Sequence, residues 1–216
     1  MNLFLIMDFS LPHWQSISNP QKALSNIMTF INSFVRSRTD NKILIIYNMK
    51  ICFDTSKSPL SSLDLKTFQL ESKNETQLSS DFGYTLWLAR NIKSRILIFH
   101  LGYEGNYFNM VKAIAVAQRM KIRVDIVSFK DVPLLHQLAV LTNGFYHNKE
   151  EGLMEFLLKL QGTSHKPTED KYYSETYCTC HSNRILYGLL CPVCLAIYCK
   201  FIPVCKRCKS KFAFEK

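Results

Sequence analysis

Seven of the chain's eight cysteines lie within residues 178–208, close enough together in sequence to share metal ions. Four of them form two C-x₂-C pairs, Cys191/Cys194 and Cys205/Cys208, separated by ten residues. A C-x₂-C turn directs two thiolates at one ion, and two such turns complete the tetrahedron that Zn²⁺ adopts in structural sites. We therefore predict that these four cysteines form a zinc site.

Two other uses of these cysteines fit the sequence less well. Disulfide bonds need an oxidising compartment, and seven cysteines cannot all pair with one another. A thioredoxin-like redox pair needs a helix directly after its C-x₂-C motif, whereas Leu195–Cys199 has an extended pattern. Structural zinc needs only reduced thiols, and it accounts for both pairs.

The other donors in this region are Cys178, Cys180, His181 and Cys199. If the ligands interleave as in a RING-type cross-brace, these four are left for a second zinc ion; if they are used in sequence order, one site is a ligand short. Side chains of neighbours such as Cys180 and His181 often diverge. The sequence thus predicts one zinc ion and leaves a second open, the alternative being that Cys199 is a buried apolar residue.

A different metal motif follows the first predicted strand. Asp8 and Ser10 lie in the stretch DFSLP, which is similar to the Asp-x-Ser-x-Ser motif with which von Willebrand factor A-type domains hold Mg²⁺. Here Pro12 replaces the last serine, and no aspartate follows the predicted strand at 95–101. We predict a degenerate site without Mg²⁺, in which Asp8 and Ser10 make helix-capping and turn hydrogen bonds.

The remaining reactive side chains are expected to be structural. No G-x-G-x-x-G or G-x-x-x-x-G-K-[ST] motif occurs, which argues against dinucleotide or nucleoside-triphosphate binding. No nucleophile has a base at a suggestive spacing, so we predict that the protein is not an enzyme. Partial burial is expected for His13 and Trp14, and core positions for His100, His136 and Cys52.

Residues 1–162 alternate between short apolar runs and amphipathic patterns, which predicts a doubly wound, mostly parallel α/β domain. Strands are predicted at residues 2–9, 42–49, 51–55, 95–101, 122–129 and 145–147, and helices at residues 20–37, 77–92, 109–120, 133–144 and 151–162. The two strands at 42–49 and 51–55 form a predicted hairpin, and 61–75 is predicted to be loop or partial helix. Asn143-Gly144 is a typical helix end.

Two further segments follow this domain. Residues 163–176 are polar, contain Pro167 and are predicted to be a linker, and residues 177–216 form a predicted zinc module of C4, RING-like type. The chain carries a net charge of +10, of which residues 171–216 hold +6. One zinc ion with four thiolates would reduce that local charge to about +4. The module is also rich in apolar residues, so we expect it to dock on the α/β domain or on a partner.

The sequence contains neither a secretory signal nor an apolar run near the roughly 20 residues of a membrane span. Met1–Met7 is apolar but lacks a basic start and is followed directly by Asp8. These features predict a cytosolic or nuclear protein, in which thiols stay reduced.

Taken together, a von Willebrand A-like domain with a broken metal site and the motif CxCH…GLLCPVCLAIYC…PVCKRCKSKF resemble the smaller von Willebrand A-type, zinc-binding core subunit of TFIIH, the Tfb4 family. The stretches SRILIFHLGYEGNYFNMVKAIAVAQRMKIRVDIVSF and LHQLAVLTNGFY support the same resemblance. It covers essentially the whole chain, although this chain is shorter than is usual for the family.

The resemblance implies a nuclear, non-catalytic scaffold in transcription initiation by RNA polymerase II and in nucleotide excision repair. Its principal partner would be the larger von Willebrand A-type zinc subunit that regulates the XPD-type helicase, whose C-terminal zinc module the A domain holds. The zinc ligands implied are Cys191, Cys194, Cys205 and Cys208. Two alternatives remain, a RING-like ubiquitin ligase and a stand-alone zinc-dependent nucleic-acid-binding protein. The thin ligand set for a second zinc argues against the ligase, and the apolar residues between the cysteines argue against the nucleic-acid binder; any nucleic-acid contact is expected to be weak or indirect.

Overall fold

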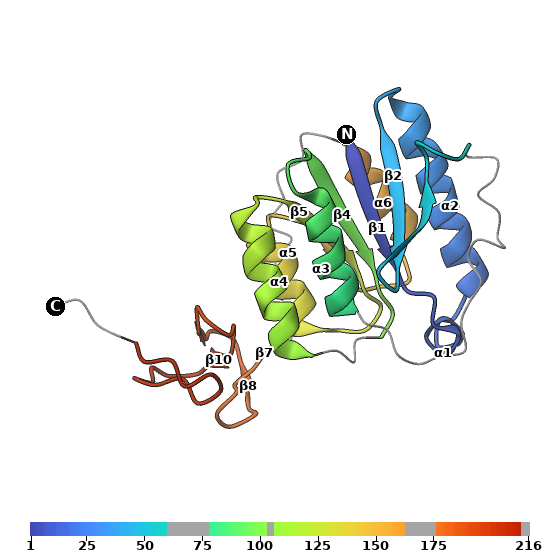
Figure 1. The fold of residues 1–216 in the computed structure, drawn as a ribbon. Helices are drawn as coiled ribbons and strands as arrows, with labels where there is room; N and C mark the ends of the chain where they lie inside the picture. The colour runs from blue at the N-terminus through green and yellow to red at the C-terminus, as the bar shows by residue number, and fades with distance from the viewer. Residues whose placement is uncertain (60–77, 103–105, 163–175, 213–216) are drawn as a thin grey trace. The chain divides into compact units, whose positions relative to one another are not determined.

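The computed structural model describes residues 1–59, 78–102, 106–162 and 176–212. The chain divides into two units, residues 1–168 and 169–216 (Figure 1). The predicted loop or partial helix at 61–75 lies outside the described residues.

A six-stranded sheet forms the centre of the first unit, with strand order β3-β2-β1-β4-β5-β6. The strands are β1 (Asn2–Met7), β2 (Lys42–Tyr47), β3 (Lys50–Asp54), β4 (Ser94–Phe99), β5 (Arg123–Val127) and β6 (Tyr146–His147). All neighbours pair in parallel except β2 and β3, which form the predicted antiparallel hairpin. The mostly parallel α/β sheet predicted from the apolar runs is therefore confirmed.

Helices cover both faces of the sheet (Figure 1). They are α1 (Leu11–Gln15), α2 (Pro20–Ser37), α3 (Leu78–Ala89), α4 (Tyr107–Arg119), α5 (Pro133–Leu141) and α6 (Leu153–Gln161). α2 packs beside α6 on one face, and α4 lies between α3 and α5 on the other. Among the described helices, none combines the length and the hydrophobicity needed to cross a bilayer.

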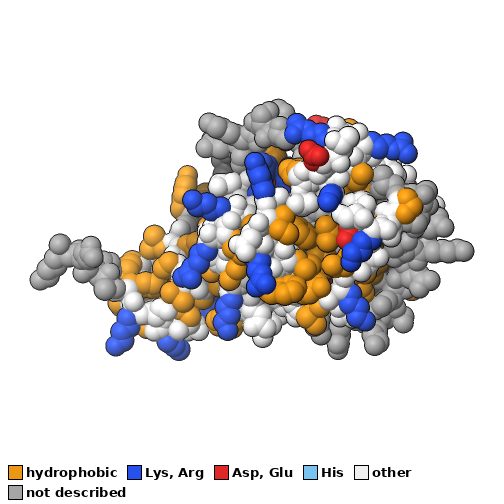
Figure 2. Space-filling view, turned by 45° about the horizontal axis from the view of Figure 1, so that its top comes forward, with side chains coloured by type: hydrophobic (Ala, Val, Ile, Leu, Met, Phe, Trp, Pro, Cys, Tyr) orange, Lys and Arg blue, Asp and Glu red, His pale blue; other side chains and the backbone are white. Residues whose placement is uncertain are grey.

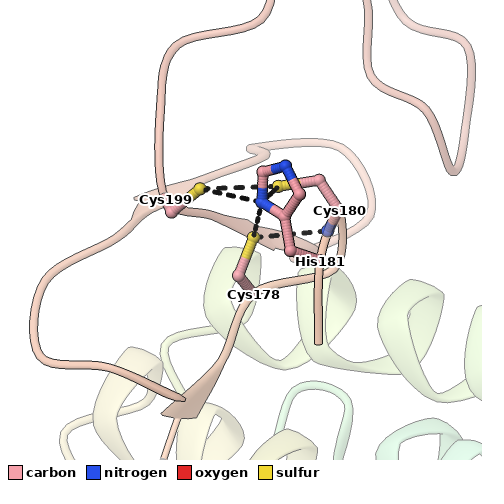
Figure 3. Close-up of side chains that lie close together, drawn as sticks. All are labelled: Cys178, Cys180, His181 and Cys199. Carbon is pink, nitrogen blue, oxygen red and sulfur yellow. Dashed lines mark hydrogen bonds between the residues drawn. The ribbon is translucent and has the colours of Figure 1, made fainter. Parts of the chain in front are cut away.

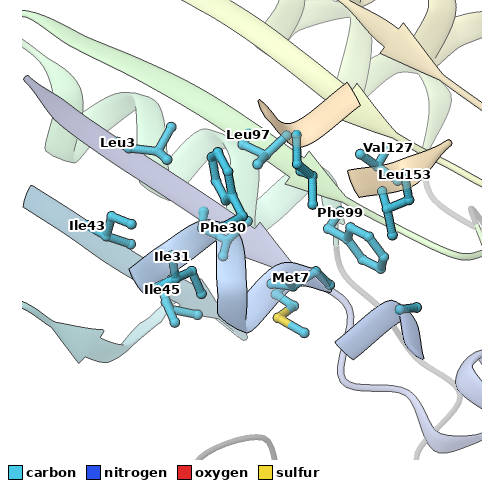
Figure 4. Packing of buried hydrophobic residues seen from close by; sticks show 14 of the residues in the cluster. Leu3, Met7, Phe30, Ile31, Ile43, Ile45, Leu97, Phe99, Val127 and Leu153 are labelled. Atoms are coloured by element: carbon cyan, nitrogen blue, oxygen red, sulfur yellow. The ribbon is translucent and has the colours of Figure 1, made fainter. Parts of the chain in front are cut away.

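The larger core cluster lies between the sheet and the pair α2–α6 (Figure 4). Alternate strand residues such as Leu3 and Ile43 pack here against Phe30 and Ile31 of α2 and Leu153 of α6. This alternation follows from the two-residue period of a strand. Two helices turn apolar faces toward the sheet, and the residues on these faces are buried: Ala23, Ile27, Phe30, Ile31 and Phe34 in α2, and Leu78, Phe82, Leu86 and Ala89 in α3.

The predicted helix end at Asn143-Gly144 is confirmed, and the two residues contribute to it in different ways. Asn143 has a φ of 55°, the left-handed conformation that closes a helix. Gly144 is required for space, since a Cβ there would lie 1.7 Å from the carbonyl oxygen of Val124 in β5. The glycine thus allows the chain to pass directly against the sheet before β6.

The second unit has four two-residue strands and, in its described residues, no helix: β7 (Thr176–Tyr177), β8 (Arg184–Ile185), β9 (Leu189–Leu190) and β10 (Ile197–Tyr198). β7 pairs with β8, and β9 with β10, both antiparallel. Its buried cluster is small and consists of Cys191, Cys194, Ala196, Tyr198 and Cys205. A cluster of this size supplies little hydrophobic stabilisation, so this unit needs an additional source of stability.

Candidate metal centres

The two C-x₂-C pairs converge in the second unit. Cys191 and Cys194 lie in the turn between β9 and β10, and the four sulfur atoms of Cys191, Cys194, Cys205 and Cys208 all lie within 4.8 Å of one another. The Sγ–Sγ separations are 3.7 Å for Cys191–Cys208 and 3.6 Å for Cys194–Cys205. Four thiolates at about 2.3 Å from a tetrahedral Zn²⁺ would be about 3.8 Å apart. The sulfur positions therefore fit a zinc ion.

A second cluster brings together Cys178, Cys180, His181 and Cys199 (Figure 3). The Sγ atoms of Cys180 and Cys199 are 3.5 Å apart. The Nδ1 atom of His181 lies 3.1 Å from Cys180 Sγ, 3.4 Å from Cys199 Sγ and 3.8 Å from Cys178 Sγ. A tetrahedral zinc ion with one nitrogen and three sulfur ligands would place nitrogen and sulfur about 3.5 Å apart. The neighbours Cys180 and His181 thus converge rather than diverge, and the donors group in the interleaved order.

Three turns with the same backbone geometry hold all of these ligands except Cys199. They begin at Cys178, Cys191 and Cys205, and in each the fifth residue donates its N–H to the carbonyl of the first, at 2.8, 2.9 and 2.9 Å. That fifth residue is left-handed in all three turns, with φ of 57° at Ser182, 58° at Leu195 and 61° at Lys209.

In two of the three turns, the first and fourth residues are the cysteines of a C-x₂-C pair. The first turn has Cys178 and His181 at these positions, so it is a C-x₂-H variant of the same turn. The C-x₂-H spacing in CTCH therefore indicates that His181 is a metal ligand, which the number of cysteines alone does not reveal.

The thiols influence one another's ionisation. Burial alone would raise the pKa of Cys178, but hydrogen bonds from Cys180 and Cys199 lower it to about 5. Conversely, the hydrogen bonds to Cys178 and Cys180 raise the pKa of Cys199, in the same cluster, to about 11. In the other cluster, burial and the hydrogen bond with Cys205 raise the pKa of Cys194 to about 12. Without a cation, one thiolate is stabilised at the expense of its neighbours. A bound dication would allow the whole set to ionise, which is the chemistry of a zinc–thiolate site.

The degenerate magnesium motif lies at the carboxyl edge of the sheet, in the first unit. Asp8 Oδ1 accepts the N–H of Ser10 at 2.9 Å, which is the turn hydrogen bond predicted for Asp8. Its Oδ2 atom lies 2.8 Å from His13 Nδ1 and 2.9 Å from His100 Nδ1. Although burial raises the pKa of Asp8, the hydrogen bonds and charge of His100, with further bonds from Ser10 and His13, lower it overall.

Several expectations for single residues need correction. Ser10 is the N-cap residue of α1, but its side chain makes no capping hydrogen bond. Trp14 is fully buried rather than partly buried, because it stacks on Phe99 and donates its indole N–H to the carbonyl of Asp8. Cys52 is exposed, since it lies on the edge strand β3.

Of the three histidine predictions, those for His100 and His13 are confirmed, whereas the core position expected for His136 is not. His100 is buried, and His13 is partly buried, as expected. His136 is only half-buried and packs edge-on against Tyr146. The sequence therefore indicated the burial of His100 correctly, but not that its ring meets Asp8.

Known proteins resemble this chain in sequence. The family model of the transcription factor Tfb4 matches residues 68–209, more than half of the chain. The general transcription factor IIH subunit 3 of Dictyostelium discoideum is 27% identical over 255 residues, covering 90% of this chain and 68% of that protein. The general transcription and DNA repair factor IIH subunit tfb4 of Schizosaccharomyces pombe is 23% identical, covering 99% of this chain and 89% of that protein.

Solved structures share the fold of the first unit. The N-terminal domain of TFIIH p34 aligns with a TM-score of 0.55 at 17% identity, covering 73% of this chain and 95% of that one. The VWA domain of SpRpn10 aligns with a TM-score of 0.53 at 15% identity, covering 76% of this chain and 98% of that one. The sheet and its helices therefore have the von Willebrand A-type arrangement.

Proposed function

Because the chain belongs to the Tfb4 family, we propose that it is a non-catalytic structural subunit of the general transcription and DNA repair factor TFIIH. In this role it acts in transcription initiation by RNA polymerase II and in nucleotide excision repair, by holding other subunits in place in the nucleus. The match to the Tfb4 family model is the observation that carries this conclusion. The von Willebrand A-type fold agrees with it.

Zinc is the cofactor that fits the second unit. We propose that Cys191, Cys194, Cys205 and Cys208 hold one zinc ion and that Cys178, Cys180, His181 and Cys199 hold a second. The sulfur and nitrogen separations and the three matching turns support both sites. The bound ions would crosslink a unit that has little hydrophobic core of its own.

The second unit exposes apolar side chains that it cannot cover itself. Leu186 and Tyr187, in the turn between β8 and β9, are 78% and 90% exposed. The same unit has a groove of about 200 Å³ lined by residues that include Leu190, Phe201 and Ile202. In Figure 2, hydrophobic side chains crowd the surface of this unit, at the left of the view, with Lys and Arg side chains at its margin. Apolar surface of this kind is typical of a protein-binding site.

We propose that the principal partner is the larger von Willebrand A-type zinc subunit of the same complex. By resemblance to the family, the α/β unit would hold that partner's C-terminal zinc module, while the apolar surface around Tyr187 would contact the TFIIH core. Residues 176–212 contain six Lys or Arg and no Asp or Glu, so an acidic surface on the core would suit this contact.

The two alternatives are separated by different observations. A RING-like ubiquitin ligase also has two interleaved zinc sites, so the number of ligands does not argue against a ligase, and it is the family match that favours the TFIIH subunit. A DNA-reading zinc finger places a helix in the major groove, and residues 176–212 contain none. Any contact with nucleic acid is proposed to be weak or indirect.

Production of the chain with and without its partner tests the proposal. We expect the full chain to be recovered in good yield only when the larger zinc subunit is co-produced, and to bind that subunit's C-terminal region. A stable, soluble full chain with no affinity for that region would contradict the proposed role. Ubiquitin transfer by the purified complex should be undetectable, and DNA binding should fall to background at physiological salt.

A surface variant tests the second unit within the same complex. Tyr187→Ala should weaken association with the TFIIH core by about tenfold or more, since exposed aromatic residues often dominate protein contacts. Its zinc content should not change. The matched control is Lys57→Ala, an exposed residue of the first unit, which should leave the association unaltered.

A further inference from the structure

Three side chains that could bind a metal meet at the carboxyl edge of the sheet. Asp8 follows β1 and His100 follows β4, and these two strands are parallel neighbours in which Met7 lies opposite Phe99. His13 comes from α1, whose chain folds back over the same edge. One donor atom from each of the three residues lies within 4.8 Å of the others. The sheet itself therefore positions two of the three donors, and the loop after β1 adds the third.

The separations of these atoms are those of hydrogen bonds, and a small movement would bring them to the spacing of metal ligands. Asp8 Oδ2 lies 2.8 Å from His13 Nδ1 and 2.9 Å from His100 Nδ1. Two ligands at about 2.0–2.1 Å from a tetrahedral ion are about 3.4 Å apart, so each of these hydrogen-bonded pairs would have to open by about 0.5 Å to admit Zn²⁺. Asp8 also accepts two backbone N–H groups, from Ser10 to Oδ1 and from Leu101 to Oδ2, which hold the carboxylate in one orientation. Such supporting hydrogen bonds are typical of ligating carboxylates.

The surroundings leave room for this arrangement. Asp8 and His100, but not His13, also line a cavity of about 10 Å³, the space of a single ion or water, together with a second buried carboxylate, Asp81, and mostly apolar side chains. A Cβ at Gly102 would lie 2.7 Å from His13 Nε2, so the glycine makes space for the His13 ring. The His13 side chain is 14% exposed, which gives an ion a route from solvent.

We propose that Asp8, His13 and His100 form a further metal site, for a first-row transition ion such as Zn²⁺. The donor set decides the choice of ion, because imidazole nitrogens suit Zn²⁺ whereas Mg²⁺ prefers an all-oxygen shell. Two histidines and one carboxylate bind a dication at the edge where the degenerate motif has lost its oxygen ligands. The ion joins the loop that carries α1 to the ends of β1 and β4.

Counting bound ions in the full chain tests the site. The chain, with its cysteine sites loaded, is dialysed against a weak chelator and titrated with Zn²⁺, and native mass spectrometry then counts the ions. Wild type should take up one ion more than His13→Asn and His100→Asn, whose affinity for that ion should fall at least about tenfold. The asparagine amide can still donate to Asp8, so these variants remove the ligand and keep a hydrogen bond. His136→Asn is the matched control and should bind as wild type does.

Two outcomes would overturn the proposal. One is an equal number of ions bound by wild type and by folded His13→Asn. His13 is more exposed than His100, so its replacement is less disruptive to folding. The other comes from Co²⁺ added to the zinc-loaded chain. Ligation by nitrogen and oxygen gives a spectrum without a thiolate charge-transfer band, whereas a thiolate band would mean that Co²⁺ had entered the cysteine sites instead. The melting temperature should also rise with Zn²⁺ in wild type by a few degrees more than in His13→Asn.

Discussion

At the scale of single residues, Cys199 is the candidate ligand whose role the spacing of the cysteines predicts least well. It lies between the two C-x₂-C pairs along the chain, yet its Sγ atom lies 3.5 Å from Cys180 Sγ and 3.4 Å from His181 Nδ1. The residue before it, Tyr198, is buried, whereas Cys199 is exposed. The alternative of a buried apolar filler is therefore wrong, and a ligand role fits the geometry.

Replacing Cys199 should remove one of the two proposed zinc ions. Cys199→Ser leaves a hydroxyl, which is a poor zinc ligand, so native mass spectrometry of the cysteine sites should count about one ion per chain instead of about two. The control is Cys52→Ser, because Cys52 is exposed on β3 and belongs to neither cluster. An unchanged ion count in Cys199→Ser would restrict the second unit to a single site.

At the scale of secondary structure elements, the passage from α5 to β6 depends on a close approach of two backbones. Gly144 follows the left-handed Asn143 and donates its N–H to the carbonyl of Ala139 at 2.7 Å. Its Cα faces the carbonyl of Val124, with no room for a methyl group. The spacing between α5 and β5 is therefore set at this residue.

Gly144→Ala should destabilise the first unit by about 3 kcal/mol or more, because the added Cβ would overlap a backbone atom that cannot move independently of the sheet. Urea unfolding followed by circular dichroism measures the change. Gly83→Ala is the control: nothing lies within 4 Å of a Cβ at Gly83 in the middle of α3, so alanine should stabilise by about 0.5–1 kcal/mol. Equal stabilities of the two variants would contradict this account of Gly144.

At the scale of the whole molecule, the two units depend on different sources of stability. The first buries a large apolar cluster between its sheet and α2–α6, which is sufficient for a domain of this size. The second buries a few residues around its cysteines and exposes Leu186 and Tyr187. Its structure is therefore expected to depend on the proposed zinc ions and on its partner.

A strong chelator should accordingly unfold the second unit alone. Hydrogen exchange in residues 176–212 should speed up by at least about a hundredfold, because the free energy of zinc binding there is folding free energy. The buried strands β1 and β4 should keep their protection, and excess Zn²⁺ should restore that of the second unit. Loss of protection in both units at the same chelator concentration would mean that their stabilities are coupled.

The sequence by itself determined the class of the fold and the family. Short apolar runs and period-3.6 patterns are local properties, so the mostly parallel sheet, the hairpin and the helices could be predicted from neighbouring residues. The two C-x₂-C pairs are local too, since each turn brings its own two thiols together.

Only the tertiary structure decided which distant side chains meet. Cys199 joins Cys180 and His181 because Thr179, in the turn that carries them, donates its N–H to the carbonyl of Ile197 in β10 at 2.8 Å, and such a contact is not encoded in the spacing of cysteines. Likewise, Asp8 and His100 are 92 residues apart and meet because β1 lies beside β4. Hydrophobic periodicity predicted that His100 is buried, but not its neighbours, since burial depends on one element whereas contact depends on the order of strands in the sheet.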